Sequence, residues 1–122
     1  MSSIAQCLEQ LAAVREAASD PRAAYLIRSR LERLMLSCAR LAAHAEGLAA
    51  PDLPGQQPTL GVDAPEPLRA IVTASSELYR QSAEICRPSE SFDVRWEDGW
   101  RRLERSLNVL ESRLGAAQIE YA

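Results

Sequence analysis

Residues 24–48 read AYLIRSRLERLMLSCARLAAHAEGL, and this stretch decides the fold. Its apolar side chains recur at alternating intervals of three and four residues, which places them on one face of an α-helix. The members of this stripe are Ala24, Ile27, Leu31, Leu34, Cys38, Leu41, Ala45 and Leu48. Pro21 favours a helix start just before the stripe, and Gly47 favours a stop near its end. The pattern predicts a helix over residues 21–48.

Three further stretches carry the same spacing. Their stripes are Ile4, Cys7, Leu11, Val14 and Ala18, then Leu68, Ile71, Ser75, Leu78, Ser82 and Ile85, and finally Trp96, Trp100, Leu103, Leu107, Leu110, Leu114 and Ala117. These stripes predict helices over residues 4–18, 66–87 and 92–118. Residues 49–63 are rich in proline and glycine and have no periodicity, so they predict an irregular linker.

The four stripes together predict an all-α fold, namely a four-helix bundle made of two αα-hairpins joined by the Pro/Gly-rich linker. A chain of 122 residues matches one ordinary domain, so we expect a single domain over residues 1–122. Apolar repeats of three and four residues favour near-parallel packing of the coiled-coil type. The linker is long enough to leave the handedness of the bundle open.

The composition excludes several classes of function. All 14 basic residues are arginine, and 17 acidic residues give a net charge of -3, so there is no basic field that would attract nucleic acid. The absence of lysine excludes Schiff-base chemistry and is typical of a GC-rich bacterial genome. No apolar run approaches the roughly 18 residues needed to cross a bilayer. We therefore expect a cytoplasmic protein that binds neither nucleic acid nor membrane.

The three cysteines, Cys7, Cys38 and Cys86, have no regular spacing and do not indicate a disulfide framework. A chain reversal at Ser19 would set Cys7 opposite Arg33 and leave Cys38 toward the other end of the hairpin. We interpret the cysteines as small apolar side chains of the core.

Motifs of catalysis are absent from the sequence. His44 is the single histidine, so the usual zinc and carboxylate-bridged iron sites cannot form. Histidine phosphotransfer domains are bundles of this size, but they typically carry lysine and glycine three and four residues after the histidine. Here Ala45, Glu46 and Gly47 follow His44, and the pattern does not match. We expect no cofactor, no metal and no enzymatic activity.

The start of the last predicted helix holds the candidate partner-binding residues Phe92, Trp96 and Trp100. Their spacing places the three rings on one face. One interpretation is a structural plug at the wide end of the bundle. The other is a hot spot for a partner, because tryptophan is enriched at interface anchors.

Two serines in the third stripe, Ser75 and Ser82, are candidate pocket residues. Polar side chains at core positions could line a small-molecule pocket between helices. Alternatively, each hydroxyl bonds to the carbonyl four residues earlier in its own helix.

The predicted helices differ in length, because those over 21–48 and 92–118 would each reach about 40 Å and the first only about 23 Å. An overhanging apolar stripe predicts a homodimer. The alternative is a monomer in which Leu53, Leu60 and Val62 cover the overhang.

The sequence as a whole predicts a non-enzymatic helical interaction protein, that is, an adaptor, chaperone or assembly factor that acts through apolar helix faces. The alternative is a small-molecule-binding bundle with its pocket near the two serines.

Overall fold

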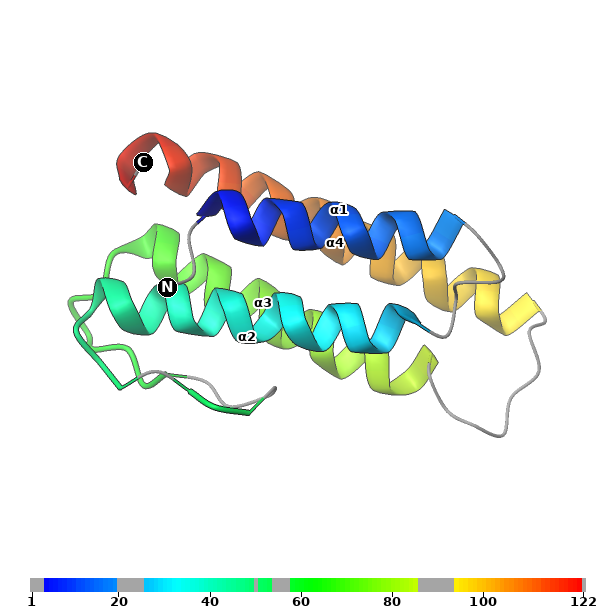
Figure 1. Cartoon of the computed structure of the whole chain (residues 1–122), viewed down its shortest axis with the longest axis horizontal. Coiled ribbons are helices and arrows are strands. Elements are labelled where there is room, and N and C mark those ends of the chain that lie inside the picture. Colours follow the sequence, from blue (N-terminus) through cyan, green and yellow to red (C-terminus); the bar gives the residue numbers. More distant parts are fainter. Residues whose placement is uncertain (1–3, 20–25, 50, 54–57, 86–93, 122) are drawn as a thin grey trace.

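The computed structural model describes residues 4–19, 26–49, 51–53, 58–85 and 94–121; the side chains of 82–85, 94–99 and 119–121 lie outside this description. The described residues form four α-helices and no strand (Figure 1). The helices are α1 (Ile4–Ser19), α2 (Ile27–Ala45), α3 (Glu66–Ile85) and α4 (Val94–Tyr121). The predicted all-α class is confirmed.

Successive helices run in opposite directions and pack as a ring. α1 packs on α2, α2 on α3 and α3 on α4, and a less extensive seam between α1 and α4 closes the ring. In Figure 1, α1 and α4 form the upper layer and α2 and α3 the lower one. This arrangement confirms the four-helix bundle of two αα-hairpins.

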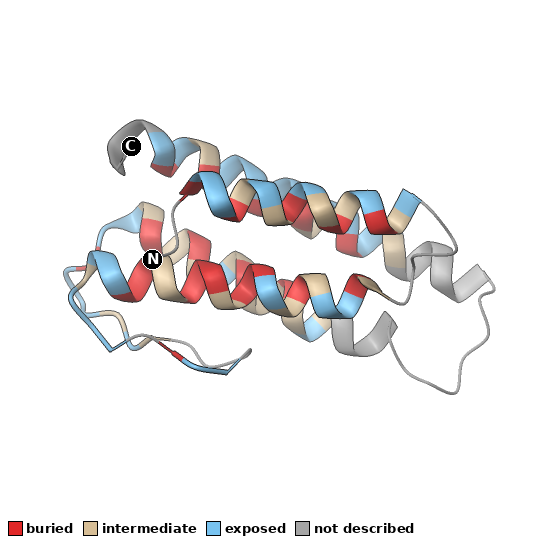
Figure 2. Ribbon diagram, in the orientation of Figure 1, coloured by how far each residue is buried: buried red, intermediate tan, exposed pale blue. Residues whose placement is uncertain are grey.

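The core lies between the four helices, where their apolar faces meet (Figure 2). Each helix supplies side chains without exposed surface, such as Val14 in α1, Leu31 in α2, Ile71 in α3 and Leu107 in α4. All four belong to the predicted stripes. Burial of each such side chain stabilises the fold by about 1.5–3 kcal/mol relative to leaving it in water.

The helix predicted over residues 21–48 is shorter in the structure. Its predicted start falls in residues 20–25, which lie outside the described residues. At its other end, Gly47 has a φ of 68°, a left-handed conformation that ends the helix. The N–H of Gly47 donates to the carbonyl of His44 at 3.2 Å, and the N–H of Leu48 to that of Ala43 at 2.8 Å. These two bonds satisfy carbonyls that the helix end leaves free.

Burial in the last turns of α2 departs from the predicted stripe. Ala42 and Ala43 are buried, whereas Leu41 is only partly buried and Ala45 is exposed. A straight helix has 3.6 residues per turn, so a repeat of 3.5 drifts by about 20° in each heptad. The buried face of α2 follows that drift, and a sustained coiled-coil seam stays a prediction.

Between α2 and α3, a stretch that includes the predicted linker 49–63, the chain has neither helix nor strand in its described parts, 46–49, 51–53 and 58–65. The linker is attached to α2 because Nε of Arg40 donates to the carbonyl of Pro51 at 3.1 Å, and Pro51 is buried. Leu53 is 62% exposed and Val62 is 93% exposed. The monomer alternative expected Leu53, Leu60 and Val62 to cover the bundle. Leu53 and Val62 do not cover it, and Leu60 is partly buried.

The homodimer was predicted because the apolar stripes of the longer helices would overhang, and the structure changes this premise for α4. α4, with 28 residues, is the longest helix and α1, with 16, the shortest. Yet Leu103, Leu107, Leu110 and Leu114 are fully buried within one chain. A second copy is not needed to cover these four leucines, and the homodimer stays a prediction that requires another surface.

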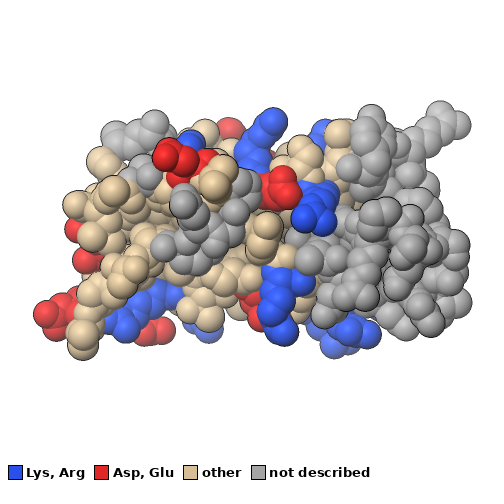
Figure 3. All heavy atoms as spheres, turned by 90° about the horizontal axis from the view of Figure 1, so that it is seen from below, with Lys and Arg blue, Asp and Glu red and all other residues tan. Residues whose placement is uncertain are grey.

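The outer surface mixes charges of both signs, and Figure 3 shows arginine and acidic side chains interspersed over one face of the bundle. Within the described helices, none combines the length and the apolarity needed to cross a membrane.

Candidate functional site

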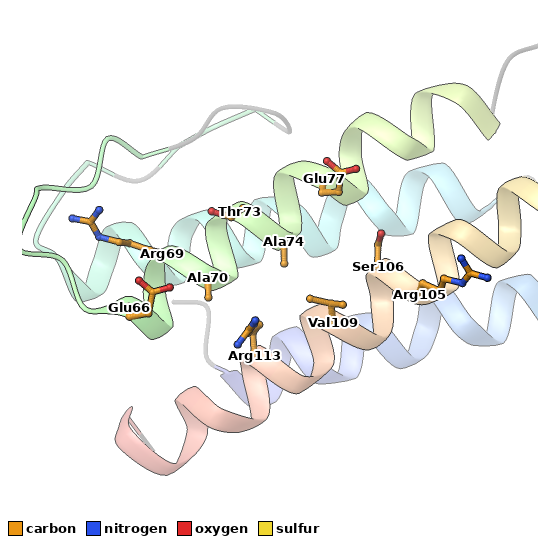
Figure 4. Close-up of a pocket in the computed structure, with 10 residues that line it drawn as sticks. All are labelled: Glu66, Arg69, Ala70, Thr73, Ala74, Glu77, Arg105, Ser106, Val109 and Arg113. Carbon is orange, nitrogen blue, oxygen red and sulfur yellow. The ribbon is translucent and has the colours of Figure 1, made fainter.

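A groove of about 640 Å³ runs along the outside of the bundle between α3 and α4 (Figure 4). Its lining consists of Glu66, Arg69, Ala70, Thr73, Ala74 and Glu77 from α3 and Arg105, Ser106, Val109 and Arg113 from α4. The residues of α3 recur at intervals of three or four, as do Arg105, Val109 and Arg113 on α4. Each helix therefore presents one face to the groove.

Short side chains explain why the two helices leave this space. Ala70 and Ala74 project from α3 toward α4, and beyond Cβ they have no atoms that would fill the gap (Figure 4). Val109 projects from the opposite wall and remains 50% exposed. Ala70, Ala74 and Val109 together form the floor of the groove, which is thus apolar and accessible to solvent.

One carboxylate of the groove already has its partners. Arg80 donates to Glu77 through Nη2 at 2.5 Å and Nε at 3.2 Å, and Nε2 of Gln81 adds a bond at 3.0 Å. The hydrogen bonds from Arg80 lower the pKa of Glu77 below its ordinary value, because they favour the ionised form. Glu77 and Arg80 therefore form a neutral pair at the edge of the groove.

The guanidinium of Arg69 is held by backbone. Its Nε donates to the carbonyl of Ala64 at 3.1 Å, and Nη2 donates to the carbonyls of Gly61 and Val62. These bonds fix the end of the linker beside the first turn of α3. The three acceptors are neutral, so Arg69 keeps its positive charge, but its guanidinium is turned toward the linker rather than toward α4 (Figure 4).

Arg105 and Arg113 are exposed and have neither a hydrogen bond nor an ion pair within the part of the chain that the structure describes. They lie one turn before and one turn after Val109 on α4. The hydroxyl of Ser106, also in the lining, donates to Oε1 of Gln81 at 2.8 Å and ties α4 to α3.

The candidate pocket serines do not form this groove. Ser75 is fully buried, and its hydroxyl donates to the carbonyl of Val72 at 3.0 Å. The bond stays within the helix, as the alternative expected, although the acceptor is three residues earlier rather than four. Ser82 lies in α3, but its side chain is outside the described residues.

The candidate aromatic cluster is described at one of its three positions. Trp100 is partly buried and packs against the core. Phe92 and the side chain of Trp96 lie outside the described residues. The face that the three rings were predicted to share stays a prediction.

The cysteine register differs from the prediction. Cys7 and Cys38 are both fully buried and free, and their thiols are hydrogen-bonded to each other. Facing positions on α1 and α2 are thus shifted by three to five residues from the prediction. Arg30 of α2 accordingly donates to the carbonyl of Ala13 in α1 at 2.7 Å. Cys86 lies outside the described residues.

The thiol pair is asymmetric. The bond from Cys38 lowers the pKa of Cys7, and the same bond together with burial raises the pKa of Cys38.

His44 is exposed in the last turn of α2. Among the described residues, no three histidine, cysteine or acidic side chains gather to hold a metal ion.

Comparisons with protein-family models, with curated proteins and with solved structures find no match to this chain. The groove is thus the candidate site on its geometry alone. The sequence analysis did not identify this groove; the signal it passed over is that Arg105, Val109 and Arg113 repeat every fourth residue outside the apolar stripe of α4.

Proposed function

We propose that the protein is a non-enzymatic helical interaction protein, of the adaptor, chaperone or assembly-factor type, that binds a protein partner in the groove between α3 and α4. The observation that carries the proposal is the half-exposed Val109 on an alanine-lined floor. Partners bind where apolar side chains can be removed from water and where a concave surface lets contacts be made on more than one side.

The other groups of the groove suit binding better than catalysis. Among the residues that the structure describes, its lining contains no histidine and no cysteine. The hydroxyl of Ser106 donates to a neutral amide, so no base is placed to activate it as a nucleophile. We propose a bacterial cytoplasmic protein with neither nucleic acid nor membrane as a partner; the arginine-only composition supports the GC-rich bacterial genome, and the net charge of -3 argues against nucleic acid.

A substitution that fills the groove tests the proposal. Val109→Arg places a long charged side chain on the apolar floor, and Val62→Arg makes the same change at a 93% exposed site outside the groove. Proteins captured by the wild-type chain from the native lysate are purified, and their Kd values are measured against both variants. We expect binding to be lost with Val109→Arg and retained with Val62→Arg. Equal binding to both variants would contradict the proposal.

A small-molecule-binding bundle is the second candidate, and the groove volume of about 640 Å³ favours it. Ligand pockets commonly measure about 300–1,000 Å³. The sequence suggested a pocket at Ser75 and Ser82. In the structure the site would instead lie beside Thr73 and Ser106. Native mass spectrometry of the purified protein should reveal a bound molecule that Val109→Arg removes. A clean apo mass for the wild-type chain would count against this candidate.

A further inference from the structure

The charges of the α3–α4 groove are unbalanced. Three arginines, Arg69, Arg105 and Arg113, line it together with two glutamates, and the guanidinium of Arg69 is bonded to linker carbonyls, so Arg105 and Arg113 are the positive charges left to a ligand. Glu77 is neutralised by its hydrogen bonds with Arg80, which leaves Glu66 as the remaining acid. The groove thus presents more positive than negative charge, although the whole chain has a net charge of -3.

Two of these arginines flank the apolar floor. Arg105 and Arg113 lie four residues on either side of Val109, so they are separated by about 12 Å along the axis of α4. An occupant that covers Val109 and extends along α4 in each direction far enough to cover Arg105 and Arg113 also removes water from the two guanidinium groups. A neutral occupant would leave them dehydrated and unpaired, which costs free energy, whereas carboxylates would replace the lost water with charge-assisted hydrogen bonds.

The length of the groove fits a helix. Along α3 it extends from Glu66 to Glu77, about 16 Å or three helical turns. On a partner helix, residues seven or eight positions apart lie on one face about 10–12 Å from each other. That separation matches the distance along α4 between Arg105 and Arg113.

We propose that the occupant is an amphipathic helix of a protein partner whose contact face carries two acidic residues seven or eight positions apart, with small apolar residues between them. The acids pair with Arg105 and Arg113, and the apolar residues cover Val109 and the alanine floor. This is recognition of a helix in a groove. The inference rests on the proposed function, because it names the chemistry of the partner at the same site.

The test is a selection from a displayed library of helical peptides of about 18 residues, long enough to form a helix. The library is panned on the immobilised full chain, with counter-selection on Val109→Arg. We expect enriched sequences to carry two Asp or Glu residues seven or eight positions apart, with alanine or other small apolar residues between them. Enrichment of neutral or basic sequences would overturn the acidic partner.

Charge reversal then identifies the pairing groups. For an enriched acidic peptide, the double variant Arg105→Glu, Arg113→Glu should weaken binding at least about tenfold in fluorescence anisotropy, and added salt should weaken binding to the wild-type chain. Arg101→Glu, an exposed change on the same helix outside the groove, should leave the Kd unchanged. A peptide with lysines in place of its acids should bind the double variant better than the wild type. Equal affinity of the acidic peptide for the wild type and the double variant would refute the pairing.

The outcomes separate the two proposals. Some peptides could lose binding with Val109→Arg and yet bind the double variant Arg105→Glu, Arg113→Glu with an unchanged Kd. Such peptides would leave the groove as the binding site and overturn only the acidic partner. Enrichment that is insensitive to Val109→Arg would overturn the groove itself. A concentration-dependent dimer in light scattering that Val109→Arg abolishes would make a second copy of this chain the occupant. Circular dichroism of each variant verifies that it is folded.

Discussion

The two glycines Gly47 and Gly115 should respond in opposite directions to the same substitution. Gly47 ends α2 with a φ of 68°, whereas Gly115 lies in the interior of α4. A Cβ added at either position meets no atom within 4 Å. Steric clashes therefore do not contribute, and Gly→Ala isolates the conformational preference of the backbone.

The magnitudes follow from that preference. At Gly47, alanine pays about 1–2 kcal/mol for the left-handed conformation, offset by about 0.4–1 kcal/mol from the lower entropy of the unfolded chain. Gly47→Ala should therefore destabilise the protein by about 1 kcal/mol. At Gly115, alanine is the better helix former by about 0.8–1 kcal/mol, so Gly115→Ala should stabilise it by about that amount.

Chemical denaturation followed by circular dichroism measures both free energies of unfolding. For a domain of 122 residues, 1 kcal/mol corresponds to about 4 °C, so the Tm values of the two variants should differ by roughly 8 °C. A stabilising Gly47→Ala would mean that residue 47 is not held in the left-handed region in solution. A destabilising Gly115→Ala would mean that the backbone there is not an open helical position.

Other residues give sharper tests of burial and charge. Leu107→Ala should lower the free energy of unfolding by about 3 kcal/mol, because its side chain is fully buried, whereas Val109→Ala on the exposed groove should change it by less than about 1 kcal/mol in the same denaturation assay. Cys7 and Cys38 should resist a thiol reagent in the native protein and react after unfolding in guanidinium chloride; fast native labelling would show that they are not buried. The pKa of Glu77 is lowered in the folded state, so its contribution to stability is present above the ordinary pKa of glutamate and is lost as pH falls. Glu77→Gln should therefore reduce the dependence of the free energy of unfolding on pH at acidic pH. The same dependence in the wild type and the variant would contradict the pairing of Glu77 with Arg80.

The fold could be predicted because apolar spacing alone determines which side of each helix is buried. Leu31, Ile71 and Leu107 lie in stripes that need no other information to be placed in a core. The sequence was less informative near Ala42 and Ala45. There the difference between 3.5 and 3.6 residues per turn decides burial, and the difference accumulates only over several turns.

The pairing of residues across helices was harder to predict than the helices themselves. Cys7 was expected opposite Arg33 and instead lies against Cys38. The prediction assumed that the chain reverses at Ser19. The point of reversal sets which residues of α1 and α2 face each other along the whole hairpin. An error of a few residues in a loop therefore moves every predicted contact between α1 and α2.

The groove was not predicted, because a groove depends on side chains that fail to fill space between two helices. Ala70 and Ala74 form it only because α4 packs beside them at this height, which no local pattern indicates. Ser75, which the sequence did single out, has its hydroxyl satisfied by Val72 within one turn of helix. As an indicator of a binding site, the polar residue Ser75 at a core position was thus weaker than the small residues Ala70 and Ala74 on the neighbouring face of α3.

The ring of helices also has a consequence for how the chain folds. Three of its four seams join helices that are consecutive in sequence, and only the seam between α1 and α4 joins distant segments. Chains dominated by such local contacts have low contact order and fold in about microseconds to milliseconds. The α1–α4 seam, which Arg15 bridges through Asn108 at 2.6 Å and Glu111 at 3.5 Å, closes the longest loop. We therefore expect this seam to form last during folding and its amide protons to exchange first in the native state.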